Sequence, residues 1–199
     1  MPFPHTLIYI HGFASSPSSW KAQLMQNEIA SRPPHRIEIP QLPFSPKAAI
    51  ELLKSLIKQQ MEMVDKQHIC LIGSSLGAYY ATWLAHTYDL KAVLINPAVH
   101  PYISLEKYLG ENRNYHSGET FTFHPHHVKE LKHYDIDIIQ KPERFLVMLQ
   151  TADEVLDYRH AVEKFPHSPL ILQQGGSHGF DDFDKMIPTV LEFAGIIDE

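Results

Sequence analysis

The chain has 199 residues, of which 44% are hydrophobic and 20% charged, and its formal net charge is −6 at pH 7. This length and balance fit one globular domain with a sizeable core. The negative charge argues against nucleic acid as the main partner, because phosphate binding needs a basic surface. We expect no membrane span, since no apolar run approaches the length that a bilayer requires. The start lacks a signal-peptide pattern and Cys70 is the only cysteine, so we expect a cytoplasmic protein without an internal disulfide.

Short apolar runs alternate with helical patterns along most of the chain. Strands of this kind, which are apolar without alternation and separated by helices, are typical of parallel sheets covered on both faces. We therefore predict an α/β fold in a single domain over residues 1–199, with about six mostly parallel strands and helices on both faces. The predicted strands are 6–10, 36–39, 68–72, 92–95, 144–149 and 170–172, and the predicted helices are 20–30, one capped by Ser45 before Pro46, 78–85 and one from about Met186.

One segment, at about residues 98–141, breaks this alternation. It is rich in Tyr, His and Phe, which argues against disorder, and it is too long for a plain connection. Leu105 and Leu109 suggest one short helix, and Val128 and Leu131 suggest another. We predict that this insertion forms a small lid over the carboxyl ends of the strands, where ligands bind in such sheets.

The stretch Gly73-Ser74-Ser75-Leu76-Gly77 has the form G-x-S-x-G between a predicted strand and a predicted helix. This setting is typical of a nucleophile elbow, a sharp turn that exposes a serine above the sheet. Small residues are needed two positions before and after the serine, because the strand and the helix crowd together. Ser75 meets that requirement, whereas Ser74 is flanked at those positions by Ile72 and Leu76.

A serine hydroxyl needs a base to take its proton and an acid to orient that base. Ser75, Asp153 and His178 follow three predicted strands, in the chain order nucleophile, acid, base. Asp157 lies close to Asp153 and is the alternative acid. If a helix begins near Val155, Asp157 would lie in its first turn, where the helix dipole favours negative charge.

These motifs together resemble the α/β-hydrolase superfamily and, within it, the YqiA-type family of small bacterial esterases. The resemblance covers nearly the whole chain. It implies hydrolysis of a small-molecule carboxylic ester or thioester, without a cofactor, by Ser75, His178 and Asp153. The residues that carry it are Tyr9-Ile10-His11-Gly12-Phe13, Gly73–Gly77, Ile95-Asn96-Pro97-Ala98, Tyr108-Leu109-Gly110-Glu111-Asn112, Asp153–Tyr158 and Gly176–Phe180.

In this fold, two backbone N–H groups hold the oxyanion that forms when the serine attacks. We expect one from Leu76, the residue after the nucleophile, and one from Phe13, in the loop after the first strand. His124, His126 and His127 are close together, but Pro125 interrupts them and no Cys or carboxylate pattern completes a metal site. We therefore predict no metal and interpret these histidines as solvated residues of the insertion.

Two other interpretations of the chain stay open. The same fold and triad serve thioesterases, peptidases and lyases, so the fold does not define the reaction. The chain could also be a non-enzymatic ligand-binding protein on a hydrolase fold, although all three triad residue types are present.

Overall fold

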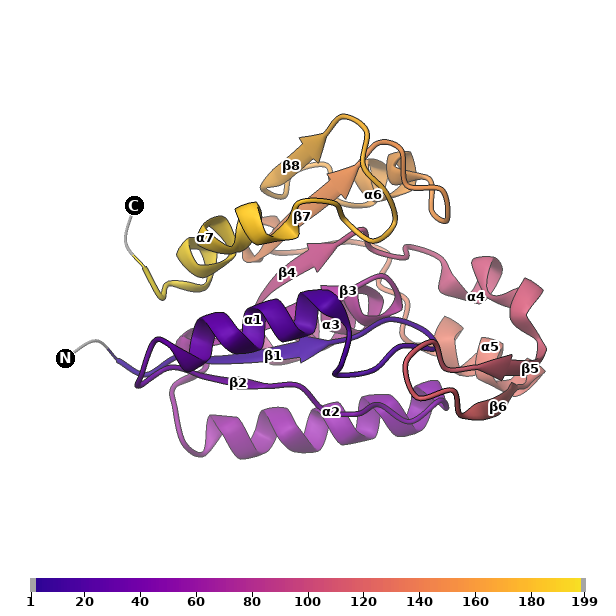
Figure 1. Ribbon diagram of the computed structural model, residues 1–199, viewed down its shortest axis with the longest axis horizontal. Helices are drawn as coiled ribbons and strands as arrows, with labels where there is room; N and C mark the ends of the chain where they lie inside the picture. The colour runs from indigo at the N-terminus through magenta and orange to yellow at the C-terminus, as the bar shows by residue number, and fades with distance from the viewer. Residues whose placement is uncertain (1–2, 198–199) are drawn as a thin grey trace.

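A sheet of six parallel strands forms the centre of the computed structural model, which describes residues 3–197 (Figure 1). The outer limits of the predicted domain, residues 1 and 199, lie outside this range. The sheet confirms the prediction of about six mostly parallel strands. In spatial order, its strands are β2 (Arg36–Glu38), β1 (Thr6–Ile10), β3 (Ile69–Ser74), β4 (Lys91–Ile95), β7 (Phe145–Gln150) and β8 (Leu170–Gln173).

The register aligns the carboxyl ends of the central strands. Ile10 at the end of β1 lies opposite Gly73 of β3, and Ser74 lies opposite Ile95 at the end of β4. Ile95 in turn lies opposite Met148 of β7. Loops that leave these strands therefore begin at one edge of the sheet, which is where parallel sheets bind ligands.

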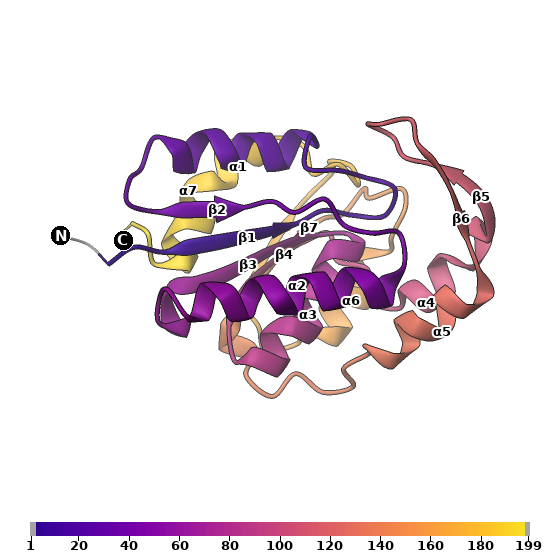
Figure 2. The same cartoon turned by 90° about the horizontal axis from the view of Figure 1, so that it is seen from below.

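Helices cover both faces of the sheet, and each face has its own buried cluster (Figure 2). Two helices pack on one face and three on the other. The first face carries α1 (Trp20–Ala30) and α7 (Phe183–Ala194), and the second carries α2 (Pro46–Met61), α3 (Leu76–Tyr88) and α6 (Tyr158–Lys164).

No helix within residues 3–197 combines the length and the apolar character needed to cross a membrane.

The helix α2 forms for the reasons that its sequence suggests. Ser45 is its N-cap and its hydroxyl oxygen accepts a hydrogen bond from the Ala48 backbone N–H at 3.3 Å. Pro46 occupies the first helical position, where a missing N–H costs nothing. The buried stripe on its inner face includes Ile50, Leu53 and Ile57. Burial of such a side chain stabilises the fold by about 1.5–3 kcal/mol.

The helix α7 begins earlier than predicted, at Phe183 instead of near Met186. Phe183 is fully buried and anchors the first turn against the sheet. Pro188, inside the helix, cannot bond the carbonyl of Asp184, but both residues lie on the exposed face. Water can therefore satisfy that carbonyl, which removes much of the penalty on which the predicted start depended.

The insertion contains a β-hairpin that the sequence analysis did not predict. Phe121 and Phe123 alternate with exposed threonines, so one face of the hairpin is buried, in the cluster that also contains α2, α3 and α6. Leu131 of the following helix is buried in the same cluster, so the insertion is part of the core. Its elements are α4 (Pro101–Ser104), a 3₁₀ turn at Glu106–Tyr108, β5 (Gly110–Arg113), β6 (Thr120–Phe123) and α5 (Pro125–His133), and the hairpin lies beyond the end of the sheet (Figure 2).

Candidate active site

Ser75 lies at the sharp turn between β3 and α3. Its backbone has φ 55° and ψ −119°, a combination that an L-residue rarely adopts. The turn is tight because strand and helix nearly touch: a Cβ on Gly73 would lie 2.4 Å from the Ala78 Cα, and one on Gly77 would lie 2.0 Å from the Ile10 carbonyl oxygen. Both glycines of the motif are therefore required by close approach, as the sequence analysis argued.

The three residues predicted as a triad come together in the structure. His178 Nε2 lies 3.0 Å from Ser75 Oγ, and His178 Nδ1 lies 2.8 Å from Asp153 Oδ2. The Asp153 side chain is 2% exposed and that of His178 is 22% exposed, so their contact is shielded from water. The buried carboxylate keeps the proton on Nδ1, which leaves Nε2 free to accept the serine proton.

The alternative acid, Asp157, lies elsewhere. Helix α6 begins at Tyr158 and not near Val155, so Asp157 is its N-cap and accepts from the Arg159 backbone N–H at 3.0 Å. The Arg159 side chain also pairs with it, which lowers the pKa of the Asp157 carboxyl to about 2. Asp153 instead accepts two backbone N–H groups, from Val155 and Leu156, which orient its carboxylate.

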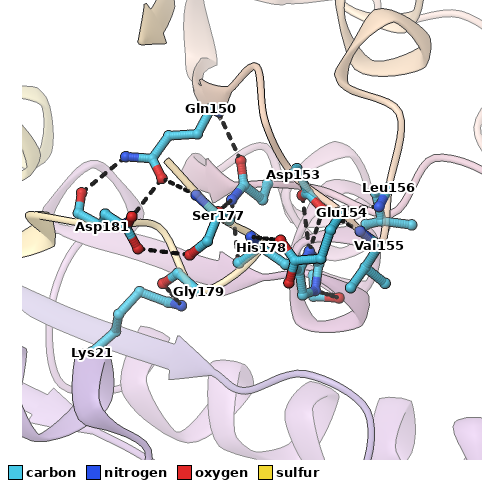
Figure 3. Close-up of polar contacts among 12 residues, drawn as sticks. Lys21, Gln150, Asp153, Glu154, Val155, Leu156, Ser177, His178, Gly179 and Asp181 are labelled. Atoms are coloured by element: carbon cyan, nitrogen blue, oxygen red, sulfur yellow. Dashed lines mark hydrogen bonds and ion pairs between the residues drawn. The ribbon is translucent and has the colours of Figure 1, made fainter. Parts of the chain in front are cut away.

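Two buried amide side chains hold the loop that carries His178, the histidine loop (residues 174–182). Gln150 Oε1 accepts from the backbone N–H groups of Ser177 at 2.9 Å and Asp181 at 2.8 Å (Figure 3). Asn96 Nδ2 donates to the carbonyl oxygens of Ser177 and His178. Asn96 and Gln150 directly follow the predicted strands 92–95 and 144–149, and the sequence motifs assign neither residue a role. A polar residue that ends a buried strand next to the triad was the available signal.

The backbone N–H groups of Phe13 and Leu76 have no hydrogen-bond acceptor in the part of the chain that the structure describes. Leu76 is the first residue of α3, where N–H groups lack helical partners. A Cβ on Gly12 would lie 3.3 Å from the Ser75 Cβ, so Phe13 follows a residue that is in contact with Ser75. Two free N–H groups beside a serine can stabilise a developing oxyanion.

The His11 ring fixes the peptide that contains the Phe13 N–H. Its Nε2 accepts from the Leu42 backbone N–H at 3.2 Å, so Nδ1 carries the proton and donates to the Gly12 carbonyl at 3.0 Å. Burial lowers the pKa of His11, which keeps the ring neutral. Because the Gly12 carbonyl and the Phe13 N–H share one rigid peptide plane, holding the first orients the second.

The insertion supports the same loop from outside. The Tyr115 backbone N–H donates to the Ala14 carbonyl at 2.8 Å, and Asn114 Nδ2 donates to the Ser15 carbonyl at 2.8 Å. The Phe13 ring packs against three aromatic rings of the insertion, with centroid distances of 5.3–5.5 Å to Tyr108, Phe121 and Phe123. The hairpin, the loop after β1 and the serine are therefore one packed unit.

A cavity of about 240 Å³ opens beside Ser75. Within residues 3–197, no group of three or more His, Cys, Asp or Glu side chains is arranged to hold a metal ion. His127 Nδ1 instead accepts from the His124 backbone N–H at 3.1 Å at the start of α5. His127 is buried and so is not solvated as predicted, whereas His124 and His126 are exposed. The cavity is lined by Gly12, Phe13, Ser75 and His178, by Leu105, Tyr108 and Tyr115 of the insertion, and by Ser19 and Lys21 at the start of α1.

Solved structures with the same architecture define the class of fold. A putative hydrolase from Agrobacterium vitis S4 superposes with a TM-score of 0.70 at 20% identity, covering 95% of this chain and 88% of that one. The mouse protein alpha/beta hydrolase domain-containing protein 10 superposes with a TM-score of 0.68 at 16% identity, covering 94% and 89%. The fold is that of the α/β-hydrolases, as the motifs predicted.

The family follows from the sequence. The model of the uncharacterised protein family UPF0227 matches residues 6–195, and the chain therefore belongs to UPF0227. A relative from Shewanella sp. (strain MR-7), the UPF0227 protein Shewmr7_1806, is 24% identical over 189 residues, which are 94% of this chain and 98% of the relative.

Proposed function

We propose that the protein is a serine esterase that hydrolyses carboxylic esters or thioesters through an acyl-enzyme on Ser75. The observation that carries this proposal is the continuous chain of hydrogen bonds from Ser75 Oγ through His178 to Asp153. Beside the serine lie a cavity and two backbone N–H groups that have no acceptor among the described residues. A packing role would require none of these features together.

In the first half-reaction, His178 Nε2 takes the proton of Ser75 Oγ, and Oγ attacks the carbonyl carbon of the bound ester. The N–H groups of Phe13 and Leu76 donate to the oxyanion that forms. Asp153 stabilises the imidazolium by accepting from Nδ1–H and does not take the proton itself. His178 then gives its proton to the leaving oxygen or sulfur, the bond to the acyl carbon breaks, and the alcohol or thiol departs.

In the second half-reaction, water replaces the departed group. His178 Nε2 takes a proton from this water, whose oxygen attacks the acyl carbon of the acyl-enzyme. The same N–H groups stabilise the second oxyanion. His178 then returns the proton to Ser75 Oγ as the acyl–oxygen bond breaks, which releases the carboxylic acid and regenerates the enzyme.

We propose further that the insertion, at about residues 98–141, acts as a lid that sets acyl preference. Its contribution of Leu105, Tyr108 and Tyr115 to the cavity wall supports this role. Because Phe121 and Leu131 are also buried in the core, removing the insertion would expose apolar surface. Point changes in the cavity wall are therefore the appropriate way to test the lid.

The esterase proposal is tested by substituting the two adjacent serines. Ser75→Ala removes the nucleophile, and loss of a triad nucleophile costs a factor on the order of a million in turnover. Ser74→Ala is the matched control: Ser74, the last residue of β3, also lines the cavity, but within residues 3–197 the hydroxyl that is hydrogen-bonded to His178 is that of Ser75 and not that of Ser74. Hydrolysis of 4-nitrophenyl butyrate should vanish in the first variant and largely persist in the second. Near-normal turnover by folded Ser75→Ala would reject the proposal.

A further inference from the structure

The wall of the cavity beside Ser75 includes the cationic side chain of Lys21, which the mechanism above does not use. Lys21 is the one Lys or Arg among the described residues that line the cavity. It is the second residue of α1, and its ammonium donates to the Gly179 carbonyl at 2.6 Å, next to His178 (Figure 3). The side chain is half-buried, so its charge lies partly out of water.

No carboxylate within residues 3–197 forms an ion pair with this ammonium. The nearby acids have other partners: Asp153 accepts from His178 and two backbone N–H groups, and Asp181 accepts from the Ser177 hydroxyl at 2.6 Å. Desolvation lowers the pKa of Lys21 to about 8, against the opposing attraction of Asp153. A partly desolvated cation without a paired anion is costly, and an anion that enters the cavity would offset that cost.

Ser19, beside Lys21 in the cavity wall, strengthens the case. Its Oγ is buried and has no hydrogen-bond partner among the described residues, although Ser19 is the N-cap of α1. The start of α1 also carries the positive end of the helix dipole. An ammonium with donors to spare, a hydroxyl without a partner and this dipole together form the chemistry that binds an anion.

We propose that Lys21 and Ser19 form a subsite for a negatively charged group of the substrate, so that the enzyme prefers esters carrying a carboxylate to neutral esters. The inference rests on the proposed esterase function. A single lysine balances one negative charge, which favours a carboxylate over a diphosphate. The carboxylate could belong to the acyl part or to the alcohol part of the ester, and the test has one arm for each.

The acyl arm compares the monoethyl esters of succinic, glutaric and adipic acid with the same esters in which a primary amide replaces the free carboxylate. The alcohol arm compares the butyryl esters of glycolic and 3-hydroxypropanoic acid with those of the matching hydroxyamides. Each amide keeps the shape of its carboxylate and removes the charge. The readout is the ratio of kcat/KM for the carboxylate over kcat/KM for the amide, measured at pH 7.

The wild-type ratio should reach about tenfold to hundredfold in at least one arm, the range expected for a hydrogen bond to a charged group. Lys21→Gln should bring that ratio close to one, and Lys21→Arg, which keeps the charge, should retain most of it. Lys185→Gln is the matched control, since Lys185 is 69% exposed, pairs with Asp182 and lies outside the cavity lining. It removes one positive charge and should leave the ratio as in the wild type.

Lys21 could alternatively serve only to hold the Gly179 carbonyl. In that case Lys21→Gln would lower kcat/KM for carboxylate and amide substrates equally, and an unchanged ratio would overturn the inference. A wild-type ratio near one in both arms, with neutral esters still hydrolysed, would also overturn it while the esterase proposal stands. This second outcome is measured on the wild-type protein alone, so it does not depend on whether a variant folds. If no ester of either kind were hydrolysed, both proposals would fail.

Discussion

Replacing Gln150 by Met tests how the histidine loop is held. The side chain of Gln150 accepts from the Ser177 and Asp181 backbone N–H groups, and its Nε2 donates to the Asp181 carbonyl and to Gln173 Oε1. Met has a similar length and no polar end. A Cβ on Gly176 would lie 2.0 Å from Gln150 Oε1, so the loop backbone is packed directly on this amide.

The cost can be worked from these contacts. Two backbone donors lose their acceptor, and each unsatisfied buried group costs about 1–3 kcal/mol. Because Asp181 is exposed and water can reach it, we expect a loss of about 2–3 kcal/mol in the free energy of unfolding. Asn96 still holds the carbonyls of Ser177 and His178, so the loop should shift and not unfold. A displacement of about 1 Å at a catalytic group lowers turnover by about a hundredfold.

The assays are urea unfolding and hydrolysis of 4-nitrophenyl butyrate. Gln173→Met is the matched control: it makes the same chemical change on the adjacent strand and removes the hydrogen bond to Gln150 and a weak contact to the Met186 sulfur, neither of which involves the histidine loop. It should cost less than about 1 kcal/mol, a single net hydrogen bond, and should leave activity within a few-fold. If Gln150→Met matched this control in both stability and turnover, the amide would not be what positions His178.

Three further predictions concern the acid, the lid and the buried thiol. Asp153→Asn should lower turnover by about ten-thousandfold through the wrong His178 tautomer, whereas Asp157→Asn, which keeps a good N-cap, should cost tenfold or less; a larger loss in folded Asp157→Asn would identify the wrong acid. Tyr108→Ala should widen the cavity and shift kcat/KM toward longer acyl chains in a 4-nitrophenyl ester series; an unchanged profile would count against the lid. Burial raises the pKa of the Cys70 thiol from 9.0 to about 12, so above pH 9 the unfolded thiol ionises while the folded one stays protonated, and stability is lost between pH 9 and 12. Cys70→Ala should reduce that loss by up to about 1.4 kcal/mol per pH unit, measured as the change in the free energy of unfolding between urea titrations at pH 8.5 and 10.5. An equal change in the wild type and in Cys70→Ala would refute this.

The layered sheet could be predicted because its signals are local. Each strand is a short apolar run with breakers at its ends, and α2 has both a capping serine and an apolar stripe. The elbow at Ser75 was predictable for a similar reason. The close approach of strand and helix requires small residues two positions before and after the serine, and both are glycine within one five-residue motif. Local signals also predicted that Asp153 and His178 each follow a strand. The contact between these two side chains depends in addition on the register of β7 and β8.

The insertion and the loop supports could not be predicted in the same way. The hairpin of β5 and β6 has an exposed, polar first strand, Gly110–Arg113, that lacks an apolar pattern. It is stabilised by contacts distant in sequence, such as the stack of Phe121 on Phe44 with ring centroids 3.8 Å apart. Gln150 and Lys21 act on the histidine loop from other elements, 27 and 158 residues away along the chain. No local pattern encodes such pairs.

The most direct test of the central claim is covalent labelling of the native protein with a small alkyl fluorophosphonate, followed by mass spectrometry of the peptides. Such a probe phosphonylates a serine only when a base activates it and an oxyanion site accepts the product. We predict one adduct on Ser75 in the wild type, and none in folded Ser75→Ala. An unlabelled wild-type protein, or an adduct on Ser74 instead, would contradict the assignment of Ser75 as the activated nucleophile of an esterase.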